Sequence, residues 1–284
     1  MQIETISIIG TGEWNEDALI VNERLGLYGV LDGATSLVPF RGPNGETGGY
    51  LASRTVKRHF DELEEAEGRP LSLQVEVARA NRLLREEMVA AGIDPSAKEE
   101  LWTTGIALVR IHDRYVEYVQ AADCMLIAVE TDGSIRIVTR DQVAYFDDNI
   151  GNLWREGRAS GLQKLEELKN YAKPYILSNK KHMNTLDGYS VLNGDPAAEE
   201  MLEYGRINRI RLKGLLLMTD GLFLPNQEGE KGAGLETVAQ RIVNEGLGAY
   251  VDWLLMLEED DANCERYPRF KQSDDKTAIW IGFS

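Results

Sequence analysis

The order of strand and helix patterns along the chain constrains the fold most. Short β-branched and aromatic runs between Gly, Asn or Asp predict strands, and apolar residues at helical spacing predict helices. The order is strands, helices, strands, helices and a last strand, which predicts an α+β fold with helices covering antiparallel sheets. The predicted strands are residues 3–9, 18–22, 27–31, 104–111, 115–121, 125–130, 134–139, 215–218 and 277–283, and the predicted helices are residues 50–67, 73–91, 162–171, 235–245 and 249–258.

The turns and breaks between these patterns suggest how the elements connect. The first three strands look like neighbours, and the four middle strands look like an antiparallel meander with a hairpin turn at 131–133. Pro70 ends the first helical pattern, and Pro174 is expected to break another. Residues 141–205 have the polar composition of a variable insert or flap. Because there is neither a repeat nor a Pro- or Ser-rich linker, we expect one domain over 1–284.

The charge and the cysteines limit the possible partners. The chain has 31 Lys and Arg against 47 Asp and Glu, a formal charge of −16, so its field repels nucleic acids and anionic membranes. Cys124 and Cys264 are far apart and do not form a disulfide framework. Neither a leader peptide nor a long apolar run stands out. We therefore expect a cytoplasmic protein without nucleic-acid or membrane partners, and a monomer.

Acidic residues next to apolar strand patterns carry the chemical signal. Asp32, Asp220 and Asp274 each adjoin such a strand, at positions where rigid backbone would hold a carboxylate at the rim of a sheet. Several such rims side by side would collect enough negative charge to need a cation. Oxygen ligands without thiolate or imidazole favour Mg²⁺ or Mn²⁺. The histidines are His59, His112 and His182, and their spacing does not fit a zinc hydrolase.

Five short blocks extend this acidic pattern over nearly the whole chain. They are Asn15-Glu16-Asp17-Ala18, Val30-Leu31-Asp32-Gly33, the strand from Thr103 to Ala107 with Ala121-Ala122-Asp123-Cys124, Met218-Thr219-Asp220-Gly221, and Asp274-Asp275-Lys276-Thr277. In this order and spacing they resemble the metal-dependent type 2C (PPM family) protein serine/threonine phosphatases. The resemblance implies a four-layer α/β/β/α sandwich of two antiparallel sheets flanked by helices.

The resemblance also implies roles for individual residues. Asp32 would bridge two Mn²⁺ or Mg²⁺ ions, and Gly33 would offer its main-chain carbonyl. Asp220 and Asp274 would complete the first metal site. Asp17 would hold metal-bound water.

Three further positions are weaker matches to the family pattern. Glu16 is either a second group that holds water or a surface charge at a strand end. Asp123 would share a third, weaker metal site with Asp220, although its block here reads Ala-Asp-Cys where relatives have Gly-Asp-Ser. Asp275 stands where relatives often carry Asn, so Asp274 is the better candidate ligand.

The phosphate-binding position departs from the family. Relatives usually carry an arginine three residues before the first block's Asn, and this chain has Gly12 there. Arg41 and Arg54 are the candidates to bind the substrate phosphate instead. About a dozen residues are inserted before the pattern resumes at residue 49, which suggests a different substrate selection.

The resemblance implies hydrolysis of phosphoserine and phosphothreonine esters in a phosphorylated protein substrate, by a metal-activated water at a binuclear centre. Two alternatives remain open. One is a non-catalytic scaffold of the same fold that binds a phosphorylated partner, an idea that the missing arginine motivates. The other is a phosphatase that uses Asp32 as the nucleophile, although that chemistry expects a second acid at position 34, where Ala34 stands.

Overall fold

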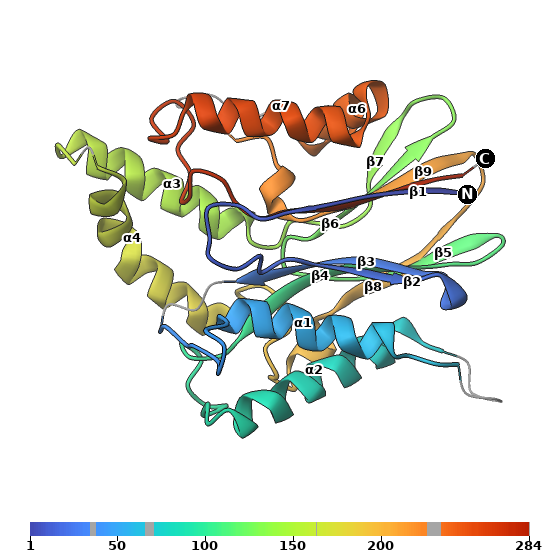
Figure 1. Ribbon diagram of the computed structural model, residues 1–284, viewed down its shortest axis with the longest axis horizontal. Coiled ribbons are helices and arrows are strands. Elements are labelled where there is room, and N and C mark those ends of the chain that lie inside the picture. The colour runs from blue at the N-terminus through green and yellow to red at the C-terminus, as the bar shows by residue number, and fades with distance from the viewer. Residues whose placement is uncertain (35–37, 66–70, 163, 226–233, 284) are drawn as a thin grey trace.

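Strands of the protein stack as two antiparallel sheets between layers of helices (Figure 1). The computed structural model describes residues 1–34, 38–65, 71–162, 164–225 and 234–283. Within these residues the first sheet contains, in spatial order, β1 (Gln2–Ile8), β10 (Lys276–Gly282), β9 (Leu212–Met218), β6 (Met125–Glu130) and β7 (Ile135–Ile137). The second contains β2 (Ala18–Asn22), β3 (Leu27–Ala34), β4 (Thr103–Ile111), β5 (Tyr115–Ala121) and β8 (Glu203–Asn208). This architecture confirms the predicted fold class.

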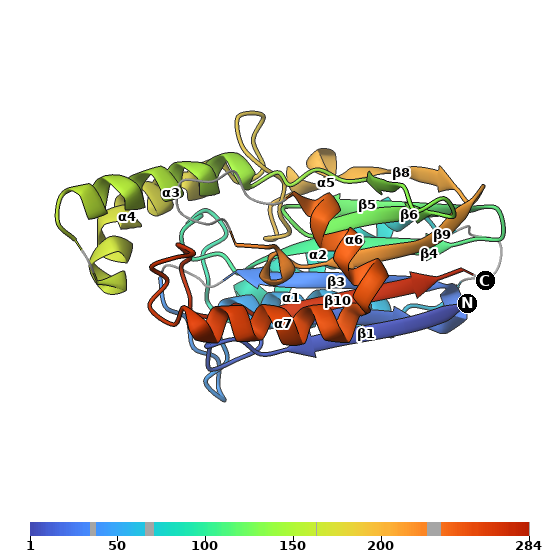
Figure 2. The same ribbon diagram turned by 90° about the horizontal axis from the view of Figure 1, so that it is seen from above.

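Helix pairs cover the two outer faces. Figure 1 shows α1 (Gly48–Asp61) and α2 (Leu73–Ala90) against the second sheet, and α6 (Leu235–Glu245) and α7 (Leu247–Asp260) against the first. A hairpin of α3 (Ala144–Ala159) and α4 (Leu165–Asn179) projects beyond one end of the sheets (Figures 1 and 2). The short elements are α5 (Ala198–Met201) and the 3₁₀ turns Glu23–Leu25, Lys180–His182 and Asp220–Leu222.

Alternation along the strands explains the layered core. In β3, Leu27 and Leu31 pack toward α1 and α2, whereas Tyr28 and Val30 pack between the two sheets. Successive side chains of a strand point to opposite faces, so a strand that is buried on both faces reads as a continuous apolar run. The sequence shows this run directly before Asp32, and the packing of both faces fixes where that carboxyl lies.

Two predicted strand neighbourhoods are wrong. Strand β1 pairs with β10, with Gln2 opposite Gly282, and lies in a different sheet from β2. Likewise β5 and β6 belong to different sheets, so the four middle strands are not one meander. The chain crosses between the sheets at Ala122, whose φ of 64° is left-handed. Apolar patterns predict strands but not their partners, whereas the predicted hairpin at 131–133 is confirmed by the β6–β7 pairing.

Residues 141–205 contain elements that the sequence reading missed. Helix α3 and strand β8 were not predicted, and Pro174 lies inside α4 instead of breaking it. Helix α4 continues past this proline, because Tyr175 and Ile176 beyond it pack against a small separate core that α4 forms with α3. The first helix ends at Asp61, earlier than predicted, and the expected stop around Pro70 lies outside the described residues.

Candidate functional site

Aspartates from both sheets lie at the same end of the sandwich. Asp17 immediately precedes β2, and Asp32 lies in β3, where its Cα pairs with that of Gly105. Asp220 follows β9, and Asp274 precedes β10. Because β9 and β10 are antiparallel, the end of one and the start of the other share an edge. Strands far apart in sequence therefore bring these four carboxyls to one region.

Asp123 joins this group from the crossing between the sheets. Its turn connects β5 of the second sheet with β6 of the first. Gly105, the pairing partner of Asp32, faces this turn: a Cβ on Gly105 would lie 3.4 Å from Asp123 Oδ1. We call Asp17, Asp32, Asp123, Asp220 and Asp274 the acidic cluster.

The members of the acidic cluster repel one another. Burial, with repulsion between the carboxylates, raises the pKa values of Asp17, Asp32 and Asp123 well above the ordinary range. The pKa of Asp220 rises to about 6, because of burial and the charge of Asp274. A hydrogen bond between the side chains of Asp220 and Asp32 opposes that rise. A bound cation would relieve the repulsion between these carboxylates.

Thr219 fixes the position of Asp17. Its Oγ1 donates a hydrogen bond to Asp17 Oδ2 at 2.8 Å, and it accepts one from the main-chain N of Thr277 at 3.1 Å. Asp17 is only 2% exposed. The two sheets are thus linked through a carboxylate of the site.

Glu16 and Gly33 lie where the start of α1 meets the sheet. Glu16 is buried, and its Oε1 accepts a hydrogen bond from the Thr47 hydroxyl, the residue that caps α1. A Cβ on Gly33 would overlap the carbonyl oxygens of Gly49 and Glu16. Only glycine therefore fits at position 33 without moving the backbone.

The two aspartates of the last block have different surroundings. Asp275 is buried, and its carboxylate accepts hydrogen bonds from the main-chain N of Gly10 and of Glu16, both at 2.7 Å. It fastens the first loop of the chain to β10. Asp274 forms an ion pair with Lys271, with 2.7 Å between Oδ1 and Nζ.

Both arginines expected to bind phosphate have other partners. Arg54 donates to the carbonyl oxygens of Asp17 at 2.7 Å and Asn15 at 3.2 Å, and its guanidinium lies over the ring of Tyr50. Arg41 forms an exposed ion pair with Glu13 at 3.3 Å. Arg54 thus supports the segment that carries Asp17, whereas Arg41 lies on the surface.

The sequence reading missed three charged residues beside the cluster. Asp141 and Asp147 lie at the start of α3, and Lys271 lies three residues before Asp274. Partial desolvation and repulsion by Asp220 raise the pKa of the exposed Asp147. Apolar residues spaced by four at the positions of Phe146, Ile150 and Trp154 could have revealed the helix that brings these acids close.

The donor chemistry of the cluster fits a hard divalent cation. Carboxylate oxygens are the ligands that Mg²⁺ and Mn²⁺ prefer, and the mutual repulsion here calls for a cation. Across the ranges that the structure describes, however, no group of three or more His, Cys, Asp or Glu side chains could hold a metal ion as they are oriented. A cation could therefore be held by these carboxylates only after their side chains rotate toward it.

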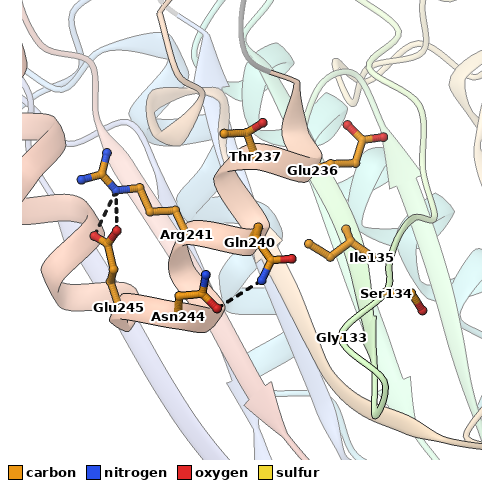
Figure 3. Close-up of a pocket in the computed structure, with 9 residues that line it drawn as sticks. All are labelled: Gly133, Ser134, Ile135, Glu236, Thr237, Gln240, Arg241, Asn244 and Glu245. Carbon is orange, nitrogen blue, oxygen red and sulfur yellow. Dashed lines mark hydrogen bonds and ion pairs between the residues drawn. The ribbon is translucent and has the colours of Figure 1, made fainter.

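A shallow hollow of about 610 Å³ lies elsewhere, between α6 and the β6–β7 turn (Figure 3). Arg241 pairs there with Glu245 at 3.0 Å, and Gln240 donates to Asn244 at 3.1 Å. The turn at Gly133 is at the other end of β6 from the acidic cluster. Four polar side chains of this hollow pair with one another, so the acidic cluster is the better candidate site.

Comparison with solved structures agrees with the fold. The serine/threonine phosphatase PstP/Ppp of Mycobacterium tuberculosis is 16% identical, with a TM-score of 0.60 over 100% of this chain and 98% of that chain. Stp1 from Staphylococcus aureus is 15% identical, with a TM-score of 0.55 over 100% and 95%. The catalytic domain of PstP solved with two manganese ions is 15% identical, with a TM-score of 0.57 over 99% and 97%.

A match to a sequence-family model identifies the protein family. Residues 7–251 match the family model of protein phosphatase 2C, and the chain belongs to that family. No curated protein matches the sequence. Within the described ranges, no helix combines the length and apolar character needed to cross a bilayer.

Proposed function

We propose that this protein is a metal-dependent protein phosphatase that hydrolyses phosphoserine and phosphothreonine esters of a phosphorylated protein. The observation that carries the proposal is the acidic cluster, in which carboxyls from both sheets meet and repel one another in a chain of the protein phosphatase 2C family. We further propose that residues 1–284 work as one domain, with the α3–α4 hairpin as a flap beside the site.

The proposed ligands follow from the positions of the residues. Asp32, the carbonyl of Gly33, Asp220 and Asp274 would hold two Mg²⁺ or Mn²⁺ ions, and Asp123 with Asp220 would hold a third. When bound, such ions activate water for attack on phosphorus and neutralise charge on the phosphoryl oxygens. Gathering carboxylates without a cation costs stability, which supports a cation-binding role over a purely structural one.

Neighbouring residues would orient the reactants. The hydrogen bond from Thr219 holds Asp17 in place, so that its carboxylate can orient the attacking water. Glu16, held by Thr47, is the second candidate for this role. Arg41 and Arg54 remain the proposed phosphate contacts from the sequence, and Arg54 also supports the segment that carries Asp17.

Hydrolysis of p-nitrophenyl phosphate and of a phosphothreonine peptide tests the proposal. We expect turnover with Mn²⁺ or Mg²⁺, none with excess chelator, and at least about a hundredfold loss in Asp32→Asn. Asp132→Asn, on the distant β6–β7 turn, is the matched control and should keep the wild-type rate.

The two alternatives predict different results. If the wild type binds phosphopeptide but shows no metal-dependent turnover, the protein is a scaffold. If phosphate is trapped covalently on Asp32, the side chain is a nucleophile. Either result contradicts the proposed mechanism.

A further inference from the structure

A phosphoryl group that approaches the acidic cluster meets many negative charges and needs a cation from the protein. Lys271 offers one. Its Nζ lies 2.7 Å from Asp274 Oδ1, so the ammonium contacts a carboxylate of the acidic cluster. The Lys271 side chain is 37% exposed and is therefore accessible from solvent.

The charge of Lys271 acts on the cluster itself. Its ammonium pairs with Asp274, a member of the acidic cluster that lies three residues further along the same segment. The positive charge of Lys271 therefore lies at the edge of the cluster, where a phosphoryl group would approach.

The segment that carries Lys271 runs beside Gly12, where the family pattern expects a phosphate-binding arginine. The main-chain N of Thr11 donates to the Ser273 carbonyl at 2.9 Å, and its hydroxyl donates to the same oxygen at 3.1 Å. A Cβ on Gly10 would overlap that carbonyl. A lysine on this segment can thus supply the positive charge that the arginine would supply at position 12.

Neighbouring residues hold this segment firmly. The guanidinium of Arg269 pairs with Asp261 at 2.7 Å and donates to the Gln272 carbonyl at 2.9 Å. On the other side, the ring of Phe270 packs edge-on against buried Trp154 of α3, with centroids 5.0 Å apart. Both chain neighbours of Lys271, Phe270 and Gln272, are thus held in place, which limits the freedom of the Lys271 backbone. This favours a preorganised contact between its ammonium and a ligand.

Arg41 and Arg54 are less available for this task. Arg54 would have to give up hydrogen bonds to two main-chain carbonyls. Arg41 pairs with Glu13 on the exposed surface and donates to the Gly45 carbonyl, and no contact ties it to the acidic cluster among the described residues. Lys271 already contacts a carboxylate of the cluster and would exchange that one oxygen for phosphoryl oxygens.

We propose that the Lys271 ammonium binds the phosphoryl oxygens of the substrate, and of the phosphate product, at the edge of the acidic cluster. This inference rests on the proposed phosphatase function and names a residue that determines phosphate affinity. It also gives the Lys271–Asp274 ion pair a role: the carboxylate holds the ammonium in place until phosphate arrives.

Direct binding separates this role from turnover. Inorganic phosphate is titrated calorimetrically into the Mg²⁺-loaded protein, as wild type, Lys271→Met, Lys271→Arg and Lys169→Met. Loss of one charge-assisted contact should raise the phosphate Kd of Lys271→Met by about tenfold or more, and Lys271→Arg should recover most of the affinity. Lys169→Met is matched, because Lys169 is 36% exposed and pairs with Glu166 at three residues' spacing; its Kd should not change.

Steady-state kinetics with p-nitrophenyl phosphate give the second measurement. In Lys271→Met we expect KM to rise more than kcat falls. A Lys271→Met protein with altered Mg²⁺ affinity but wild-type phosphate Kd would show that Lys271 only neutralises Asp274, and would overturn the inference. If Lys271→Met does not fold, Lys271→Gln takes its place: a folded Lys271→Gln protein with a phosphate Kd raised about tenfold or more supports the contact, and one with the wild-type phosphate Kd refutes it.

Failure of this inference and failure of the proposed function look different. Phosphate binding that depends on Lys271 in a protein without hydrolytic activity supports the inference and refutes the function. Metal-dependent hydrolysis with a phosphate Kd indifferent to Lys271 supports the function and refutes the inference.

Discussion

At the scale of single residues, the acidic cluster opposes folding when no cation is bound. Asp17, Asp32 and Asp123 have raised pKa values in the folded protein, so each charge is easier to carry in the unfolded chain. Hydrogen bonds such as that from Thr219 to Asp17 offset part of this effect. The acidic cluster thus lowers the stability of the cation-free protein, and stability measurements can detect this effect.

Asp220 allows a quantitative test of that effect. Its pKa rises from the ordinary 3.8 to about 6 on folding, so the folded state binds more protons between these values and the free energy of unfolding falls as pH rises. In chelator, Asp220→Asn should therefore be more stable than wild type at pH 7, by up to about 3 kcal/mol, with the difference vanishing near pH 4. Urea unfolding at several pH values measures it.

Asp132 gives the control with the opposite sign. Hydrogen bonds from Ser134 lower the pKa of this exposed carboxyl, so its charge favours folding above the ordinary pKa and that effect is lost as pH falls. Asp132→Asn should therefore be no more stable than wild type at pH 7. A pH-independent effect of Asp220→Asn would contradict the account of the cluster.

At the scale of elements, the site depends on close backbone contact between β3 and the start of α1. Gly33 lies against the carbonyls of Gly49 and Glu16, with no space for a side chain. We expect Gly33→Ala to lower the free energy of unfolding by about 1–3 kcal/mol, because the new methyl group overpacks this contact. Denaturant unfolding measures the change.

Gly151 is the matched control for that substitution. It lies inside α3, and a Cβ there would have no atom within 4 Å. Gly151→Ala should therefore be neutral or stabilise by up to about 1 kcal/mol, since alanine is the better helix former. Equal destabilisation by both substitutions would argue against the close contact at Gly33.

The α3–α4 hairpin has a small core of its own, which predicts local behaviour. Trp154 is buried there with Leu168 and Ala172, apart from the main layers. Trp154→Ala should speed amide hydrogen exchange over 144–179 while leaving the amides of β4 protected, because the hairpin can open alone. Uniform loss of protection in both regions would show that the hairpin unfolds only with the whole protein.

Local sequence patterns predicted the helices and strands well, but they predicted poorly which strands pair with each other. The bounds of β2, β5, β6 and α6 agree with the sequence patterns, because alternation and helical spacing are local properties. The partner of β1 is more than 250 residues away, and nothing local indicates it. The candidate aspartates could be named from their blocks, whereas Lys271 could not, because it lies outside the blocks and a spacing of three residues in a loop does not predict an ion pair.

At the scale of the whole molecule, the formal charge of −16 should select among substrates. A phosphothreonine peptide flanked by Lys and Arg is attracted over a distance that salt shortens. Its kcat/KM should therefore fall as salt rises from about 50 to about 500 mM, while that of a peptide flanked by Glu should rise. Parallel salt dependence of both peptides would show that the net charge has no part in recognition.

Among the described strands, β1 hydrogen-bonds within its sheet to β10 alone, so it stays unpaired until residues 276–282 have been made. On the ribosome, Asp17 and Asp32 emerge long before Asp274 does. The proposed reaction centre therefore cannot assemble before Asp274 has been made, and translation products that stop short of this residue should be unable to dephosphorylate a substrate.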